Sequence, residues 1–262
     1  MINMQRLASF FGLEGKSAVV TGSGQGIGRA IATLLADAGA SVVVADLNTE
    51  TAASVAASIN TAGGKATSTF LDVSDLASID QLVAFTQAAY GGIDIWVNNA
   101  GIFPKMPFTE VTPALWDKVE AVNMRGAFFC MQAAVKDMKR HEKGGRIVNL
   151  SSVASRNVTI YDQPHYSATK AGVSAMTRAA AAEFAADNIL VNGICPGGVG
   201  TEGAASSQTV MPRGPIMGAG RMPLNRVATP DEIAAAVLYL VGPAGAYVTG
   251  HEIVVDGGFL VS

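Results

Sequence analysis

The amino-acid sequence predicts an α/β fold: one doubly wound domain in which helices cover both faces of a parallel sheet of about seven strands. Strand-like and helix-like segments alternate along the whole chain, which is the order that βαβ units produce. The strand segments are continuous apolar runs rather than period-2 patterns, as expected for strands that are buried on both faces. Because no repeat or linker divides the 262 residues, we expect a single domain over residues 1–262.

In the first half of the chain, apolar runs indicate the strands, and glycine or capping residues indicate the helix ends. Gly39 ends the first Ala- and Leu-rich helix, and Gly63 begins the turn after the second. Asp46 closes the second strand, and Asp75 is a suitable N-cap for the third helix. The expected elements are strand 17–20, helix 29–37, strand 41–45, helix 49–62, strand 66–71, a helix after Asp75 and strand 93–97.

The second half continues the same alternation. Thr229 and Pro230 form a favourable helix start, since proline is well tolerated in the first helical turn. Residues 201–223 are rich in Gly, Ser and Met and predict an irregular segment. The expected elements are helix 113–139, strand 146–150, a helix that carries Tyr166 and ends near residue 186, strand 189–194, helix 230–240 and strand 252–255.

Composition and charge disfavour several classes of protein. Apolar residues make up 49% of the chain and charged residues 15%, which is typical of a folded enzyme. The net charge of −3, without an uninterrupted basic cluster, disfavours nucleic-acid binding. No segment approaches the roughly 18 apolar residues of a membrane span, and no signal-peptide pattern begins the chain. We expect neither nucleic acid nor membrane as a partner.

The cysteines and histidines predict a reducing compartment and no metal site. Cys130 and Cys195 lie far apart in apolar surroundings, which suits buried thiols. The three histidines, His141, His165 and His251, show no metal-ligand spacing. A cytoplasmic protein without a metal is therefore the expectation.

Polar residues and glycines gather where the predicted strands end. In a parallel sheet these carboxyl ends meet at one edge, and the ligand crevice lies there. The residues placed at this edge are Gly22, Asp46, Asp72, Asn98, Ser151, Ser152 and Pro196.

A glycine loop follows the first strand and predicts a nucleotide site. Gly22, Gly26 and Gly28 are spaced G-x-x-x-G-x-G, and glycines let the backbone approach a pyrophosphate at the helix N-terminus. Asp46 lies 18 residues after Gly28, where a carboxylate can accept hydrogen bonds from ribose hydroxyls and repel a 2′-phosphate. Gln25 adds no positive charge to the loop. The pattern therefore favours NAD over NADP.

Tyr166 and Lys170 are four residues apart and lie on one face of the predicted helix. An ammonium beside a phenol stabilises the phenolate, so we expect Lys170 to lower the pKa of Tyr166 from about 10. Such a tyrosine can act as a general acid or base on an alcohol or ketone. The spacing alone is common by chance, and it gains meaning from the nucleotide site at the same edge.

Together these motifs resemble the short-chain dehydrogenase/reductase family over nearly the whole chain. The matching motifs are Thr21-Gly22-x-x-x-Gly26-x-Gly28, Asp72-Val73, Asn98-Asn99-Ala100-Gly101, Asn123, Ser151-Ser152, Tyr166-x-x-x-Lys170 and Pro196-Gly197-Gly198-Val199-Gly200-Thr201. The resemblance implies a Rossmann-like fold. It also implies an oxidoreductase that interconverts a secondary alcohol and a ketone by hydride transfer with NAD(H).

The resemblance implies catalytic roles for four residues. Tyr166 would be the general acid/base, and Lys170 would lower its pKa and bond the nicotinamide ribose. Ser152 would bind the substrate oxygen, and Asn123 would hold a water molecule that links Lys170 to solvent. Cofactor binding is implied for Gly22, Ser23, Gln25, Gly26, Ile27, Gly28, Asp46, Leu47, Asp72, Val73, Asn99, Ala100, Gly101, Tyr166, Lys170, Pro196, Gly197, Val199 and Thr201.

The choice of serine depends on spacing. Ser152 lies 14 residues before Tyr166 and Ser151 lies 15 before it. We select Ser152, the second residue of the pair, and keep Ser151 as the first alternative and Ser155 as the second.

The stretch of about 202–224 resembles a variable substrate lid, with Met211, Met217 and Met222 as adaptable apolar residues. A small to medium alcohol or ketone, including cyclic and aromatic ones, is the expected substrate. A sugar or polyol is one alternative; a 3-oxoacyl carrier-protein reductase is another, which Asp46 disfavours because those enzymes mostly use NADPH. A non-catalytic NAD-sensing regulatory protein is a third. Small residues on the helix after Tyr166, together with the resemblance, predict a homotetramer.

Overall fold

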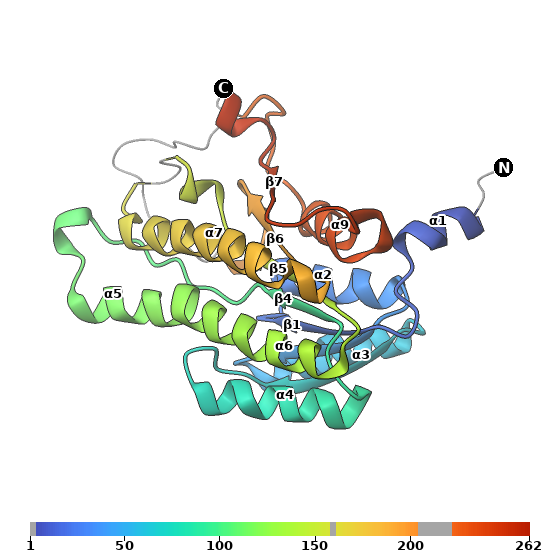
Figure 1. Ribbon diagram of the computed structural model, residues 1–262. Helices are drawn as coiled ribbons and strands as arrows, with labels where there is room; N and C mark the ends of the chain where they lie inside the picture. Colours follow the sequence, from blue (N-terminus) through green and yellow to red (C-terminus); the bar gives the residue numbers. More distant parts are fainter. Residues whose placement is uncertain (1–3, 158–160, 204–221) are drawn as a thin grey trace.

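The structure is a computed structural model that describes residues 4–157, 161–203 and 222–262 (Figure 1). The strands of this part form one sheet with the order β3-β2-β1-β4-β5-β6-β7, and every neighbouring pair is parallel. They are β1 (Ser17–Thr21), β2 (Ser41–Asp46), β3 (Lys65–Phe70), β4 (Ile95–Asn98), β5 (Gly145–Leu150), β6 (Ile189–Pro196) and β7 (Glu252–Val255). The predicted sheet is confirmed. Its order reverses between β1 and β4, which is where a doubly wound sheet opens a crevice for ligands.

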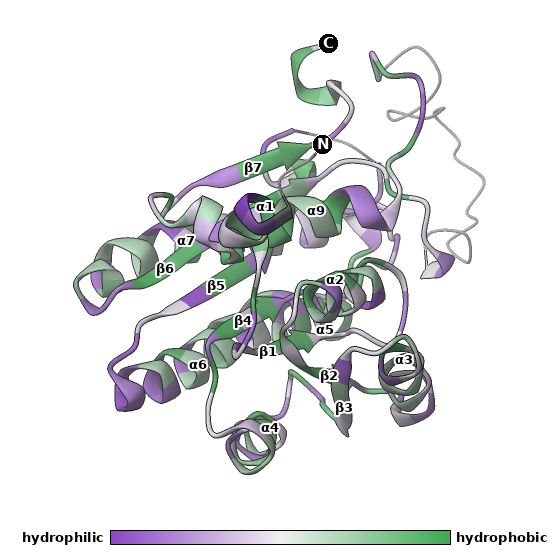
Figure 2. Cartoon of the chain, turned by 90° about the vertical axis from the view of Figure 1, so that its right-hand side faces the viewer, coloured by the Kyte–Doolittle hydropathy of each residue, from purple (hydrophilic) through white to green (hydrophobic). Residues whose placement is uncertain are grey.

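Helices cover both faces of the sheet, as Figure 2 shows. α2, α3 and α9 pack on one face, and α4, α6 and α7 pack on the other. The helices are α1 (Met4–Phe11), α2 (Gly26–Asp37), α3 (Thr49–Thr61), α4 (Leu76–Tyr90), α5 (Pro113–Glu120), α6 (Ala127–His141), α7 (Pro164–Phe184) and α9 (Pro230–Val241).

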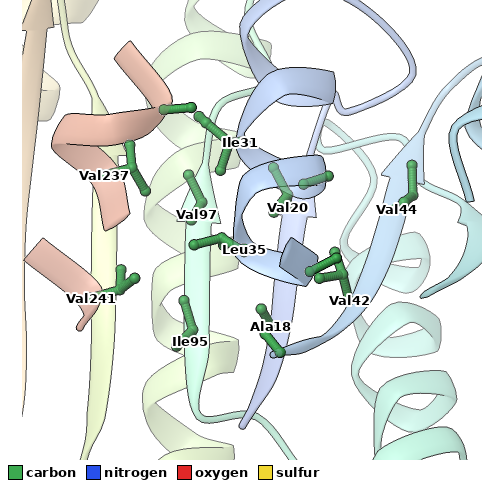
Figure 3. Close-up of a cluster of buried hydrophobic side chains, with 14 of the residues drawn as sticks. Ala18, Val20, Ile31, Leu35, Val42, Val44, Ile95, Val97, Val237 and Val241 are labelled. Carbon is green, nitrogen blue, oxygen red and sulfur yellow. The ribbon is translucent and has the colours of Figure 1, made fainter. Parts of the chain in front are cut away.

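Two apolar layers, one on each face, attach the helices to the sheet. On one face Val97 of β4 lies with Leu35 of α2 and Val237 of α9 (Figure 3). On the other face the fully buried Trp96 of β4 belongs to the layer that includes Met138 of α6. Consecutive residues of a strand point to opposite faces, so both positions must be apolar. This explains why the strands read as continuous apolar runs.

Two N-terminal elements differ from the sequence prediction. α1 was not predicted, because its eight residues lie before the strand–helix alternation begins; it packs beside the end of α9 (Figure 1). α2 begins at Gly26, three residues earlier than expected. Glycine is a poor helix former, so the sequence pattern placed the helix start after Gly28.

The single long helix expected over residues 113–139 is divided by a π-helical turn, Ala121–Gly126, between α5 and α6. At Gly126 a Cβ atom would lie 2.7 Å from the carbonyl oxygen of Val73. A residue with a side chain would therefore force the turn away from the loop that follows β3. The π-helical turn places Asn123 inside the protein, where it is 1% exposed.

Most of the predicted lid over residues 202–224 lies outside the described residues, and Met211 and Met217 lie there with it. Within the described ranges, no helix has both the length and the apolar character needed to cross a membrane. The same ranges contain no cluster of His, Cys, Asp and Glu that could hold a metal ion. Cys130 and Cys195 are free, buried thiols.

Candidate active site

A cavity of about 930 Å³ opens at the carboxyl ends of the strands. It brings together residues that are far apart in sequence, from the ends of β1, β2, β4, β5 and β6 and from α7. The predicted site residues that line it are Gly22, Gln25, Gly26, Ile27, Gly28, Asp46, Leu47, Asp72, Val73, Asn99, Ala100, Gly101, Ser152, Tyr166, Lys170, Pro196, Gly197, Val199 and Thr201. Ser23 and Asn123 do not line it.

The glycine loop forms a close-fitting backbone cradle at one end of the cavity. Gly22 and Gly26 have φ angles of +62° and +54°, in the left-handed region that favours glycine. A Cβ atom on Gly28 would overlap the carbonyl oxygen of Gly22. Asn99 holds the loop in place, because its Nδ2 donates to the carbonyl oxygens of Thr21 and Gly22 over 2.9 and 2.8 Å. The loop therefore leaves its backbone accessible at the start of α2, as binding of a pyrophosphate requires.

Asp46 is fixed at the edge of the cavity beside this loop. One carboxylate oxygen accepts from the backbone N–H of Gly24 over 2.8 Å, and the other accepts from Asn48 N–H over 2.9 Å. Asp72 is similarly held, since its Oδ1 accepts from the N–H and the hydroxyl of Ser74. Both carboxylates thus have defined orientations in the wall of the cavity.

The Ser23 side chain is used within the protein. It is fully buried, its hydroxyl donates to the carbonyl oxygen of Val20 over 2.6 Å, and it accepts from the N–H of Ala45 over 3.1 Å. These bonds join β1 to β2. The predicted cofactor contact of Ser23 gains no support from its side chain and stays a prediction.

Tyr166 and Lys170 face each other across one turn of α7. The Lys170 side chain is buried, its Nζ donates to the carbonyl oxygen of Leu150 over 2.7 Å, and Nζ lies 5.7 Å from the centre of the Tyr166 ring. The ring of Phe103 meets the Tyr166 ring edge-on, with 6.3 Å between ring centres. The Ser152 hydroxyl lies close enough to the Tyr166 hydroxyl to lower the pKa of Tyr166.

The expected effect of Lys170 on the pKa of Tyr166 is not what the structure gives. Burial raises the pKa of Tyr166, and the Ser152 hydroxyl only partly opposes this. Burial also lowers the pKa of Lys170 from 10.5 to about 8. The prediction was wrong because it considered the charge of Lys170 and left out the desolvation of both groups.

The structure separates the three candidate serines. The Ser151 hydroxyl points under α7, where it lies 2.8 Å from the Ser174 hydroxyl and donates to the carbonyl oxygen of Lys170 over 3.1 Å. Ser155 donates to the carbonyl oxygen of Ser152 over 2.7 Å. Of the three, Ser152 is the one whose side chain affects the pKa of Tyr166, and its catalytic role stays a prediction.

Asn123 braces the loop after β4. Its Oδ1 accepts from the N–H of Ile102 over 2.8 Å, and its Nδ2 donates to the carbonyl oxygen of Ile102 over 2.7 Å. Both ends of the carboxamide are thus engaged with one residue. A proton relay through Asn123 stays a prediction, and the side-chain bonds support a positioning role.

The cavity wall also contains residues that sequence reasoning did not assign to the site. Gln163 is a polar residue of this kind, and Val227 contributes apolar surface; Met222, which belongs to the predicted lid, also lines the cavity. The apolar residues Ile102, Phe103 and Val153 also line the cavity. The only sequence signal for Gln163 was its place three residues before Tyr166.

The chain is similar to named proteins over nearly its whole length. A family model described as enoyl-(acyl carrier protein) reductase matches residues 22–260. A short chain dehydrogenase/reductase of Aspergillus oryzae is 39% identical over 251 residues, which are 95% of this chain and 96% of that protein. A sorbitol dehydrogenase of Cereibacter sphaeroides is 37% identical over 255 residues, covering 94% and 98%.

A solved structure has the same fold. The crystal structure of a short-chain type dehydrogenase/reductase from Mycobacterium marinum superposes with a TM-score of 0.90 at 33% identity, and covers 97% of this chain and 99% of that one.

The buried ammonium of Lys170 predicts a specific pH dependence of stability. Between pH 8 and pH 10.5 the unfolded chain keeps the proton on Lys170 and the folded chain has released it. The unfolded state then binds more protons, so this residue makes stability rise with pH in that window. Relative to Lys170→Met, the free energy of unfolding of the wild type should increase from pH 8 upward in urea titrations. Lys136→Met, at an exposed position of α6, is the control and should show no such trend. The prediction would be contradicted if the difference in free energy of unfolding between the wild type and each variant did not change with pH.

Proposed function

This chain belongs to the short-chain dehydrogenase/reductase family, and we propose that it interconverts a secondary alcohol and a ketone by hydride exchange with NAD(H). Membership of the family makes it an oxidoreductase that acts on CH–OH groups. The observation that carries the finer proposal is the contact of Ser152 with Tyr166 beside the buried Lys170, in the cavity that the glycine loop enters.

The residues present fit a dinucleotide cofactor. The glycine loop of Gly22, Gly26 and Gly28 would bind the pyrophosphate, and its fold depends on glycine because a Cβ atom at Gly28 would collide with the loop. Asp46 would bind the adenosine ribose, and Val199 and Thr201 would meet the nicotinamide end. When bound, the nicotinamide ring supplies the hydride acceptor or donor.

Tyr166 transfers the proton of the reaction, and the neighbouring side chains stabilise the charges that develop. In reduction the Tyr166 hydroxyl gives its proton to the substrate oxygen, and in oxidation its phenolate takes the hydroxyl proton of the alcohol. Burial raises the pKa of Tyr166 and favours the protonated form that reduction uses, whereas the positive charge of Lys170 favours the phenolate that oxidation uses. Ser152 donates a hydrogen bond to the substrate oxygen and stabilises the charge that develops there. Lys170 holds positive charge beside the phenolate.

The preference for NAD over NADP rests on Asp46. Its carboxylate is oriented by the N–H groups of Gly24 and Asn48, so it cannot turn away from a nucleotide in the cradle without losing both bonds. A 2′-phosphate would meet a fixed negative charge. Arg29, the cation at the start of α2, is already paired with Glu202 over 2.6 Å.

The substrate end of the cavity is mainly apolar, with Phe103, Val153 and Met222 in its wall. This supports a small to medium alcohol or ketone, with cyclic and aromatic compounds included. The sorbitol dehydrogenase among the relatives supports the alternative of a sugar or polyol. A purely regulatory NAD sensor has no use for the Ser152–Tyr166 contact, and an NADPH-dependent acyl carrier-protein reductase is disfavoured by Asp46.

A homotetramer in the cytoplasm completes the proposal. The exposed face of α7 consists largely of small side chains, and exposed aromatic residues lie on the neighbouring helices. The residues concerned are Ala168, Ala171, Ala175, Ala179, Trp116 and Phe128. Small side chains allow helices of different subunits to approach closely. The buried free thiols of Cys130 and Cys195 support a reducing compartment.

We expect Ser152→Ala to lower kcat with secondary alcohols by about 100-fold or more, because it removes a hydrogen bond to the developing oxyanion. Ser151→Ala should mainly lower stability, since its hydroxyl bonds to Ser174 and Lys170. NADH absorbance with NAD and a panel of acyclic, cyclic and aromatic alcohols and polyols measures both variants. Loss of turnover in Ser151→Ala with retention in Ser152→Ala would overturn the assignment. Failure of every alcohol with the wild type would overturn the proposed function.

We expect the wild type to favour NAD, and Asp46→Ser to lower the ratio of kcat/KM for NAD over NADP by about 10-fold or more, since the fixed charge that repels a 2′-phosphate is lost. Asp75→Ser is the matched control, because Asp75 caps α4 by accepting from the N–H of Ala77. Its ratio should equal that of the wild type. A wild type that uses NADP as well as NAD would contradict the proposed cofactor.

A further inference from the structure

We propose that Gln163 is a specificity residue whose carboxamide oxygen accepts a hydrogen bond from a second hydroxyl of the substrate. The substrate would then be a diol or polyol in which another hydroxyl lies near the reacting carbon. This inference rests on the proposed function and names the substrate class of the same site. It follows from the burial, orientation and position of one side chain.

Gln163 is buried and faces the cavity. Only 4% of the residue is exposed, and it lines the cavity together with Tyr166. It occupies the N-cap position of α7, where side-chain oxygens commonly accept from the first N–H groups of the helix. The Gln163 side chain makes no such bond. The buried Gln163 side chain therefore does not stabilise the start of the helix.

One hydrogen bond fixes which end of the amide reaches the cavity. The Nε2 of Gln163 donates to the carbonyl oxygen of Phe103 over 2.7 Å. A carbonyl oxygen can only accept, so the NH₂ group must lie on that side and Oε1 on the other. Within the described ranges no donor forms a hydrogen bond to Oε1, and Oε1 is not among the side-chain atoms that are sealed inside the protein without a partner. A strong acceptor is thus left toward the cavity.

The position of this acceptor is tied to the reacting tyrosine. Phe103, which receives the bond from Gln163, also packs its ring edge-on against Tyr166. Gln163 directly precedes α7, three residues before Tyr166, and both residues line the same cavity. A substrate oxygen held by Tyr166 and Ser152 therefore lies in the same part of the cavity as Oε1. A neutral acceptor there suits a hydroxyl group and not a carboxylate.

His165 provides a matched control. Its Nε2 donates to the carbonyl oxygen of Pro104, next to Phe103, over 3.1 Å. His165 is 1% exposed and does not line the cavity. Both Gln163 and His165 thus hold the loop after β4, and only Gln163 can also touch a substrate. A purely structural role would make substitutions of the two residues act alike.

The test compares cyclohexanol with cis- and trans-1,2-cyclohexanediol, which differ by one hydroxyl. The wild type should oxidise the better diol with a kcat/KM at least about 10-fold above that of cyclohexanol, because the Gln163 acceptor loses its contact with water when the substrate enters, and only the diol replaces that contact with a hydrogen bond. Gln163→Met, similar in length and without either hydrogen bond, should lower this preference by about 10-fold or more. His165→Leu should change both substrates by the same factor.

Two results would overturn the inference and leave the proposed function standing. One is a wild type that oxidises cyclohexanol as well as either diol, which needs no variant and is decisive even if Gln163→Met does not fold. The other is an unchanged preference in Gln163→Met, as in His165→Leu. Absence of NADH formation from all three alcohols and from the wider panel would instead remove the proposed function itself.

Discussion

The hydrogen bond from the buried Lys170 ammonium to the carbonyl oxygen of Leu150 fixes α7 over the end of β5. Around it, the Ser151 hydroxyl bonds to the carbonyl oxygen of Lys170, and Ser174 donates to Glu252 of β7 over 2.6 Å. α7 is therefore tied to two strands by polar contacts inside an otherwise apolar interface. This register directs Ser151 under the helix and leaves the next residue, Ser152, to face Tyr166. The geometry of the reacting groups thus depends on one buried charge.

Much of the fold could be predicted, because a strand that is buried on both faces consists of consecutive apolar residues that are easily recognised in the sequence. Trp96 and Val97 are neighbours in β4 and belong to opposite layers of the core, so both had to be apolar. The glycine loop could also be predicted from the sequence, since only glycine fits the close backbone approach at Gly28. Asp46 was found because it ends a strand next to that loop. These features are local in sequence and have one physical explanation each.

The remaining features depend on contacts between distant segments. The π-helical turn of Ala121–Gly126 arises where Gly126 meets the carbonyl of Val73, and no periodicity within the helix reveals it. The pKa of Tyr166 is raised because the folded chain removes water from the phenol. The four-residue spacing between Tyr166 and Lys170 gives no information about this burial. Gln163 gains its role from the carbonyl of Phe103, 60 residues away. Such residues can be identified only after the fold has brought them together.

Exchange of Tyr166 for phenylalanine isolates the hydroxyl on which the proposed chemistry depends. The variant keeps the ring that packs against Phe103 and Lys170, so NADH binding, followed by the fluorescence of the nicotinamide, should be retained. The rate of NADH formation with an accepted alcohol should fall by about 100-fold or more, because the general base is gone. An unchanged rate in Tyr166→Phe would contradict the proposed catalytic roles of Ser152, Tyr166 and Lys170.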